Sequence, residues 1–117
     1  METVFIWLDD LRPIKLSEYW NGYKKCLHAH SVKQAKEFII SEEKDGAERF
    51  FLDLDHDLGI YAKDGGDGIE LIKWLIETGR NNSNYKVNIH SMNVVGKMNM
   101  KALINRYWED KNDENEV

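Results

Sequence analysis

The sequence has one cysteine and one proline in 117 residues, and it has no long run of apolar residues. Because Cys26 has no second cysteine to pair with, a disulfide within the chain is excluded, and we expect a protein of the reducing cytoplasm. The apolar run that begins at Val4 is interrupted by Asp9, so it is too short for a membrane span. It also lacks the basic flank of a signal peptide, and we expect no membrane association.

Positive charge is also scarce. The chain has 16 Lys and Arg residues against 21 Asp and Glu residues, which gives a formal net charge of −5. A surface of this sign repels the backbone of a long nucleic acid, so binding to a duplex is not expected. A small nucleotide or the end of an RNA carries few phosphates and is compatible with this charge. The sequence indicates no particular protein partner.

The length and composition fit one domain. A hydrophobic content of 42% is enough for a single core. We predict that residues 1–108 form this domain. Residues 109–117 are rich in Asp, Glu and Asn, and we predict that they form an acidic, disordered tail.

Apolar patterns predict strands that alternate with helices. Val4–Leu8 and Phe50–Leu54 are nearly continuous apolar runs, as in strands covered on both faces, whereas residues 85–90 alternate as an edge strand does. Residues 25–30 are a weaker strand candidate. A short helix is predicted at 16–20, a second helix begins after a cap at Ser31, and a third runs from a cap at Asp67 to a stop at Gly79. A last helix begins at Asn93 or Gly96 and extends to Tyr107. This alternation predicts a parallel sheet with helices on both faces.

Polar residues follow three of these strands. Asp9 and Asp10 come after the first apolar run, and a cluster that begins with Asp55 comes after the second. His90 ends the alternating strand. Ligands of parallel α/β sheets bind beyond the carboxyl ends of the strands, so we expect these side chains to converge. Carboxylates gathered there would repel one another without a cation, and their hard oxygens suit Mg²⁺ or Mn²⁺.

Three ordered motifs resemble the cyclic-phosphate processing receiver-like family, a divergent form of the response-regulator receiver. They are Leu8-Asp9-Asp10-Leu11-Arg12, Leu54-Asp55-His56-Asp57-Leu58-Gly59, and His90-Ser91-Met92-Asn93-Val94-Val95-Gly96-Lys97-Met98-Asn99-Met100. The resemblance implies a receiver-like (flavodoxin-like) three-layer sandwich with four parallel strands in the order 2-1-3-4. We expect the last receiver strand to be absent, because little sequence remains for it after Tyr107. Asp53 and Val94 depart from the family pattern, which has a small residue and a proline at these positions.

The predicted site has three groups of residues. The carboxylates predicted to bind the metal are Asp9, Asp10, Asp55 and Asp57. The side chains predicted to carry protons in catalysis are His56 and His90, because histidine exchanges protons near neutral pH. Four residues are predicted to bind phosphate. Arg12 would do so through its charge, and Ser91, Asn93 and Gly96 through their position at the start of the last helix.

Simpler interpretations exist for several of these residues. Aspartates after strands often cap turns, and His56 could pack over the sheet edge or anchor its loop. Asp57 could bind the metal, orient His56 or cap the loop that runs to Gly59. We interpret Asp53 as a group behind the ligands or on the surface, because the family motif does not include it.

Together these features predict a divalent-metal-dependent phosphoesterase that opens a cyclic phosphate. The substrate would be an RNA end with a 2′,3′-cyclic phosphate or a cyclic nucleotide. One alternative is a signalling receiver phosphorylated on Asp55, which the missing strand and its lysine disfavour. Another is a module that binds a phosphorylated ligand without chemistry.

Overall fold

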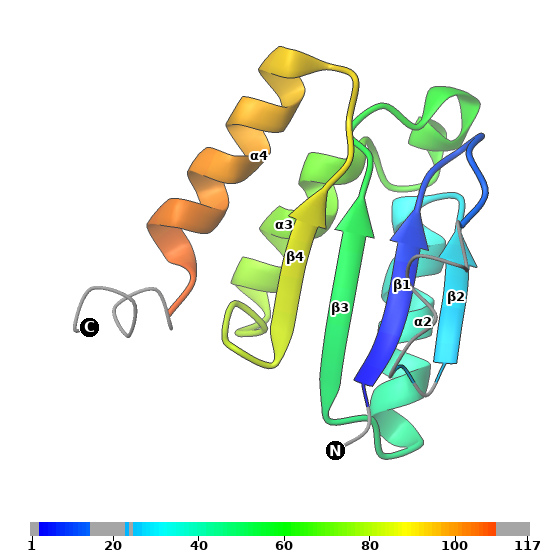
Figure 1. Cartoon of the computed structure of the whole chain (residues 1–117), viewed down its shortest axis with the longest axis vertical. Coiled ribbons are helices and arrows are strands. Elements are labelled where there is room, and N and C mark those ends of the chain that lie inside the picture. Colours follow the sequence, from blue (N-terminus) through cyan, green and yellow to red (C-terminus); the bar gives the residue numbers. More distant parts are fainter. Residues whose placement is uncertain (1–2, 15–22, 24, 110–117) are drawn as a thin grey trace.

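Four parallel strands form the sheet, in the order β2-β1-β3-β4 (Figure 1). They are β1 (Thr3–Leu8), β2 (Lys25–Ala29), β3 (Arg49–Leu54) and β4 (Tyr85–Ile89). The structure is a computed structural model that describes residues 3–14, 23 and 25–109. The parallel sheet and its strand order confirm the predicted receiver-like fold. Within the described ranges the sheet has no further strand.

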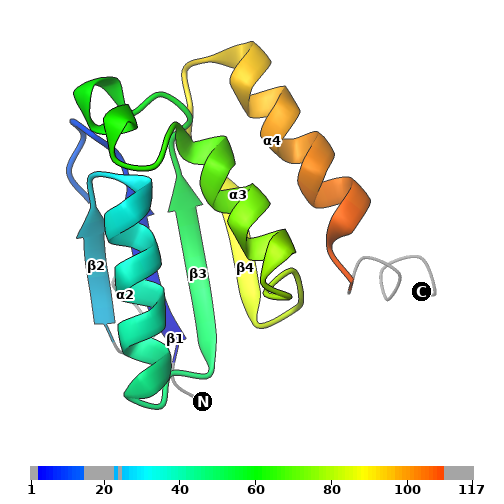
Figure 2. The same ribbon diagram turned by 180° about the vertical axis from the view of Figure 1, so that it is seen from behind.

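The described helices lie on one face of the sheet, beside its β4 edge and beyond the ends of its strands (Figures 1 and 2). The described residues therefore show helices on one face, whereas the sequence predicted helices on both faces. They are α2 (Val32–Lys44), the short 3₁₀ helix η1 (Gly59–Lys63), α3 (Gly68–Glu77) and α4 (Val94–Tyr107). Figures 1 and 2 show α2 and α3 against one face, with α4 beyond β4, next to α3. The helix predicted at 16–20 lies outside the described residues. No helix in the described part of the chain is long and apolar enough to cross a bilayer.

Strand alternation sends β1 and β3 side chains to two different environments. On the helix-covered face, Val4, Ile6 and Leu8 pack with Leu52 and the apolar sides of α2 and α3 in the main core. The opposite face is aromatic over much of its length. The Phe5 ring lies 5.2 Å from the Tyr23 ring and 5.6 Å from the Phe51 ring, measured between centroids. Asp53 lies on this second face.

Two of the predicted helix caps are present and a third is replaced. The Ser31 hydroxyl accepts the Gln34 N–H, and the side-chain amide oxygen of Asn93 accepts the Gly96 N–H, so α4 begins directly after Asn93. Asp67 precedes α3, but its carboxylate makes no cap bond with that helix. It accepts the Leu58 N–H at 3.1 Å instead. The capping box predicted at Asp67 is therefore wrong. The Asp67 side chain instead connects the loop after β3 to the start of α3.

The chain after α4 packs against the lower end of β4. Trp108 is buried, and its indole N–H donates to the Tyr85 carbonyl at 2.9 Å. The Glu109 N–H donates to the Asn81 carbonyl at 3.0 Å. Glu109, which the sequence assigned to the tail, is thus tied to the domain. The remaining residues of the predicted tail lie outside the described part of the chain.

A polar cluster joins α2, the loop after α3 and β4 at the end of the sheet where the strands begin. Arg80 donates to both carboxylate oxygens of Glu43 at 2.8 and 2.9 Å, and the Tyr85 hydroxyl donates to Glu43 at 2.5 Å. The hydrogen bond from Arg80 holds the pKa of Glu43 below its usual value, although burial raises it. The hydrogen bond from Tyr85 lowers this pKa further. Burial, followed by the Glu43 contact, raises the pKa of Tyr85 to about 12.

We predict that Glu43→Gln lowers the free energy of unfolding by about 1–3 kcal/mol at neutral pH, because it weakens partly buried charged hydrogen bonds. The folded-state pKa of Glu43 is depressed, so its contribution is present above the unfolded-state pKa. It is lost as the pH falls through the folded-state value. Urea denaturation should show the difference between wild type and variant shrinking in acid.

The exposed Glu37 on the same helix gives the matched control. Glu37→Gln should change the free energy of unfolding by no more than about 0.5 kcal/mol. A Glu43→Gln effect that is absent at neutral pH, or that does not shrink in acid, would contradict this account of the cluster.

Candidate metal centre

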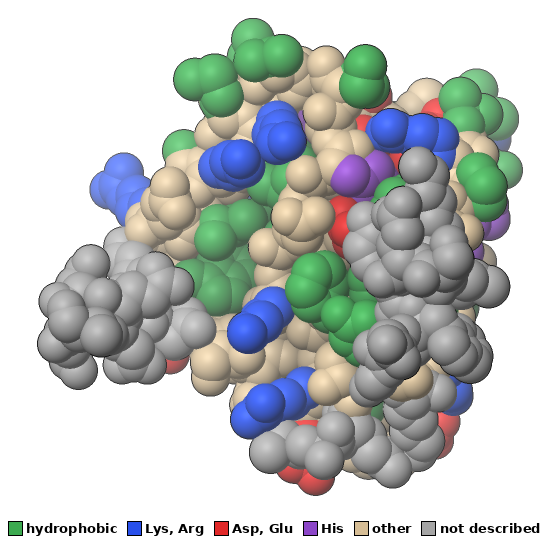
Figure 3. All heavy atoms as spheres, viewed as in Figure 1, with side chains coloured by type: hydrophobic (Ala, Val, Ile, Leu, Met, Phe, Trp, Pro, Cys, Tyr) green, Lys and Arg blue, Asp and Glu red, His purple; other side chains and the backbone are tan. Residues whose placement is uncertain are grey.

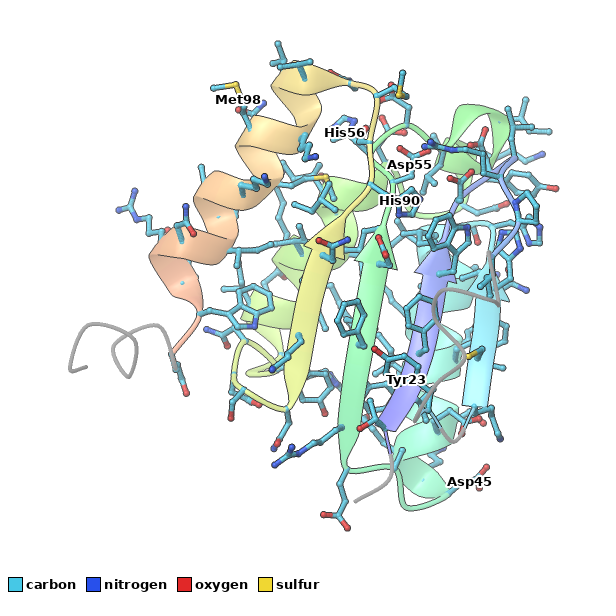
Figure 4. The ribbon with its side chains drawn as sticks, in the orientation of Figure 1. Tyr23, Asp45, Asp55, His56, His90 and Met98 are labelled. Atoms are coloured by element: carbon cyan, nitrogen blue, oxygen red, sulfur yellow. The ribbon has the colours of Figure 1, made fainter. Side chains whose placement is uncertain are left out.

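Three side chains converge where the strands end. Asp9 follows β1, Asp55 follows β3 and His90 follows β4, and each backbone N–H continues the strand ladder into a neighbouring carbonyl. Figure 4 shows Asp55 and His90 together beyond the arrowheads of the sheet. One ligand atom from each of the three residues lies within 4.8 Å of the other two. The convergence expected from the sequence is therefore present in the structure.

Asp9 is 1% exposed, yet it is held as a carboxylate. One of its oxygens accepts the backbone N–H groups of Leu11 and Arg12, at 2.8 and 2.7 Å. The other accepts the Arg12 Nε–H at 3.1 Å and faces the His90 Nε2 at 2.9 Å. Burial raises the pKa of Asp9, but these hydrogen bonds and the Arg12 charge outweigh it and hold the pKa below its usual value.

Asp55 is shifted the other way. Burial raises its pKa, and the negative charge of Asp9 raises it further. Hydrogen bonds from the Ser91 hydroxyl and the His56 N–H oppose this only in part. The nearest Arg12 nitrogen is 3.6 Å from the carboxylate. A cation between Asp9 and Asp55 would relieve their repulsion, so the donor set fits a hard divalent ion.

The Asp53 side chain contacts the ring of His90. The side chain is fully buried, and one of its oxygens lies 2.6 Å from the His90 Nδ1. The Trp7 indole stacks on the same imidazole, with ring centroids 3.8 Å apart and planes 4° apart. A surface position for Asp53 is therefore wrong. The signal in the sequence was its spacing, since Asp53 lies two residues before Asp55 and shares its face of the strand.

An open cavity of about 540 Å³ lies over the convergence. It is lined by many of the predicted site residues, namely Asp9, Asp10, Arg12, Asp55, Asp57, Ser91 and Asn93, together with Leu11, Gly59 and Met92. His56, His90 and Gly96 were predicted to take part in the site but are not among its lining residues. Any catalytic role for the two histidines stays a prediction.

The start of α4 is fastened to the loop after β3. His56 Nδ1 lies 2.6 Å from the Asp57 carboxylate, and the Asn93 amide donates to the same carboxylate at 3.1 Å. A β-carbon at Gly96 would lie 2.5 Å from the His56 ring, so glycine makes room for the histidine. The Gly96 N–H is already used by Asn93. His56 thus anchors this loop, one of the roles expected for it.

The four carboxylates predicted as metal ligands separate into different places. Asp9 and Asp55 share the convergence with His90, whereas Asp57 belongs to a second group with His56 and Asp67. Asp10 belongs to neither group. Its carboxylate lies beside Gly59, where an added β-carbon would be 2.7 Å from one oxygen. Asp10 and Asp57 therefore line the cavity from its rim.

Residues 4–106 match the family described as the cyclic-phosphate processing receiver domain. The chain belongs to this family. No curated protein and no solved structure matches the chain. The family description links this receiver domain to the processing of cyclic phosphates. The match includes every residue of the predicted site, from Asp9 to Gly96.

Exposed apolar side chains surround the cavity of this receiver domain. Leu11 is 83% exposed and Met92 85% exposed, and both line the cavity. Val94, Val95 and Met98 extend the apolar surface along the start of α4. Figure 3 shows hydrophobic side chains on both sides of a group of acidic, basic and histidine side chains. A ligand whose charged end enters the cavity would meet apolar surface at its other end.

We predict that Gly96→Ala destabilises the protein by about 1–3 kcal/mol, because the methyl group would overlap the His56 ring. This overlap should exceed the gain of about 1 kcal/mol in helix propensity. Chemical denaturation measures the change. Val95→Ala, at an exposed neighbouring position, should stay within about 0.5 kcal/mol of wild type. A more stable Gly96→Ala protein would show that the overlap is absent.

We also predict that Asp55→Asn stabilises the protein in the absence of metal, because the amide is not disfavoured by burial beside the Asp9 charge. Manganese at a hundred times its dissociation constant should stabilise the wild type by about 2.7 kcal/mol. The variant should gain little. Thermal denaturation with and without Mn²⁺ measures both effects.

Asp45→Asn is the control for this pair of measurements. Asp45 lies exposed at the far end of α2, away from the site (Figure 4). This variant should respond to Mn²⁺ as the wild type does. Equal stabilisation of the Asp55→Asn protein by Mn²⁺ would mean that the ion binds elsewhere.

Proposed function

We propose that this receiver domain is a divalent-metal-dependent phosphoesterase that opens a cyclic phosphate, at a 2′,3′-cyclic RNA end or in a cyclic nucleotide. The observation that carries the proposal is the buried Asp9 and Asp55 pair, which faces an open cavity and carries more negative charge than Arg12 alone offsets. The family description supports the choice of substrate. The half-buried Cys26, a free thiol, is compatible with action in the reducing cytoplasm.

Asp9 and Asp55 would hold Mg²⁺ or Mn²⁺, with His90 beside them. When bound, the ion would polarise the phosphoryl oxygens and lower the pKa of a coordinated water. Arg12 would pair with the phosphate from the cavity edge, because its side chain is 48% exposed and its guanidinium is already oriented by Asp9 and the His90 carbonyl. The Ser91 hydroxyl, which bonds Asp55, lines the same cavity and would orient the ion-binding carboxylate.

The reaction adds water across one ester bond of the ring. The water oxygen forms a new bond to phosphorus, the bond from phosphorus to one sugar oxygen breaks, and a phosphomonoester with a free hydroxyl remains. The attacking water gives up one proton and the leaving alkoxide gains one. We assign acceptance of the water proton to Asp10 or Asp57, because both carboxylates line the cavity. The carboxylic acid formed in this way returns the proton to the leaving alkoxide, so the carboxylate is regenerated. The apolar Leu11 and Met92 would lie against the sugar or base.

Hydrolysis of 2′,3′-cyclic mononucleotides in the presence of Mg²⁺ or Mn²⁺ tests the proposal. We expect turnover by the wild type and at least a hundredfold loss in Asp55→Asn, the scale of loss seen when a group that stabilises the transition state is removed. Asp45→Asn should keep wild-type activity. Absence of turnover with every divalent ion tried, or full activity of Asp55→Asn, would rule the phosphoesterase out.

One observation also favours phosphorylation of Asp55. The Ser91 hydroxyl bonds this carboxylate, and Arg12 places a cation 3.6 Å from it, where the two groups could contact an added phosphoryl group. Incubation with a small phosphodonor would then add one phosphoryl mass to the wild type and none to Asp55→Asn. Tight nucleotide binding with neither product nor phosphorylation would instead indicate a binding module.

A further inference from the structure

The buried Asp53 determines which nitrogen of His90 carries a hydrogen toward the sheet. A carboxylate can only accept hydrogen bonds, so the His90 Nδ1, at 2.6 Å, must donate to it. The other Asp53 oxygen accepts from the Asn88 amide at 3.3 Å, which fixes the carboxylate itself. The Trp7 indole, stacked on the imidazole, prevents the ring from rotating out of this plane.

With Nδ1 donating to Asp53, Nε2 is the nitrogen that faces the convergence. It lies 2.9 Å from the Asp9 carboxylate and belongs to the same group of close ligand atoms as Asp55. In the metal-free protein Nε2 contacts the Asp9 carboxylate through its own hydrogen, which a bound ion would replace. A histidine that donates one ring N–H to a carboxylate while its other nitrogen meets a cation is the usual arrangement around protein-bound metals. In this chain the supporting carboxylate comes from Asp53.

We propose that Asp53 is a positioning residue that presents the His90 Nε2 as the third ligand of the ion held by Asp9 and Asp55. The inference rests on the metal dependence proposed above and specifies the metal class. An imidazole nitrogen favours Co²⁺ or Zn²⁺, whereas Mg²⁺ prefers an octahedron of oxygens and Mn²⁺ lies between these two preferences. The site therefore selects a transition-metal ion over Mg²⁺, unlike a site built from carboxylates alone.

A competing account gives Asp53 a purely electrostatic role. In that case its negative charge would attract every divalent cation by a similar factor, and His90 would never touch the ion. The two accounts differ in selectivity, because loss of a nitrogen ligand weakens the binding of Co²⁺ far more than that of Mg²⁺. They also differ in what happens to the nitrogens of His90.

The first test uses wild-type protein labelled with ¹⁵N at its four histidines. His90 is assigned by comparison with His90→Gln. On titration with diamagnetic Zn²⁺, we expect the His90 Nε2 signal to move to a metal-bound position while Nδ1 keeps its hydrogen. Saturation with Zn²⁺ that leaves both His90 signals unchanged would overturn the proposal.

The second test measures calorimetric dissociation constants for Mg²⁺, Mn²⁺ and Co²⁺. The wild type should bind Co²⁺ and Mn²⁺ at least about tenfold more tightly than Mg²⁺. Asp53→Asn should lose about 10- to 100-fold in Co²⁺ affinity, the usual effect of removing such a supporting carboxylate, with a much smaller loss for Mg²⁺. Parallel losses for all three ions would instead support the electrostatic account and overturn ours.

Asn88→Ala is the matched control, because it removes the other partner of Asp53 and leaves the contact to His90 in place. It should keep the wild-type order of metal affinities. If circular dichroism shows that Asp53→Asn is unfolded, His90→Gln supplies the same comparison, with loss of Co²⁺ preference expected and retention contradicting the proposal.

These measurements separate the two proposals, because none of them requires turnover. A preference for Co²⁺ with a shifted His90 signal, but no hydrolysis of any cyclic nucleotide, would leave Asp53 as a positioning residue and remove the phosphoesterase. Hydrolysis that depends on Asp55 while the His90 signals stay unchanged would keep the phosphoesterase and remove the inference about Asp53.

Discussion

The burial of like charges at the ends of the central strands is the constraint on which this structure depends. Asp9, Asp53 and Asp55 are each at most 7% exposed, and a buried carboxylate is costly unless it is hydrogen-bonded and matched by positive charge. Backbone N–H groups and Arg12 donate hydrogen bonds to Asp9, and His90 pairs with Asp53. The hydrogen bonds and positive charge around Asp55 compensate its burial least, so its pKa is raised and a cation fits beside it.

The parallel register of the sheet produces this arrangement. Trp7, Asp53 and Asn88 are direct neighbours across β1, β3 and β4. Two residues further along, on the same face, the next set of neighbours is Asp9, Asp55 and His90. The first set positions His90 of the second set, because Trp7 stacks on the His90 ring and Asp53 bonds to it. The geometry of the candidate metal centre is therefore a consequence of strand pairing, which the apolar face beneath α2 and α3 stabilises.

Much of the fold and the outline of the site could be predicted from the sequence. Apolar runs and capping residues identify elements because their signals are local, and parallel strands necessarily gather their carboxyl ends at one edge. The role of Asp53 could not be predicted in the same way, because its partner His90 is 37 residues away and their contact depends on strand order. The separation of Asp57 from Asp9 and the packing of His56 on Gly96 likewise depend on loop paths that carry no periodic signal.

The most direct test of the central claim is the position of a bound ion. Crystals grown with Mn²⁺ should give an anomalous scattering peak between the carboxylates of Asp9 and Asp55, within coordination distance of the His90 Nε2. A peak at the group formed by His56, Asp57 and Asp67, or a fully ordered site with no peak at saturating Mn²⁺, would contradict the claim that these buried charges are arranged to hold one cation.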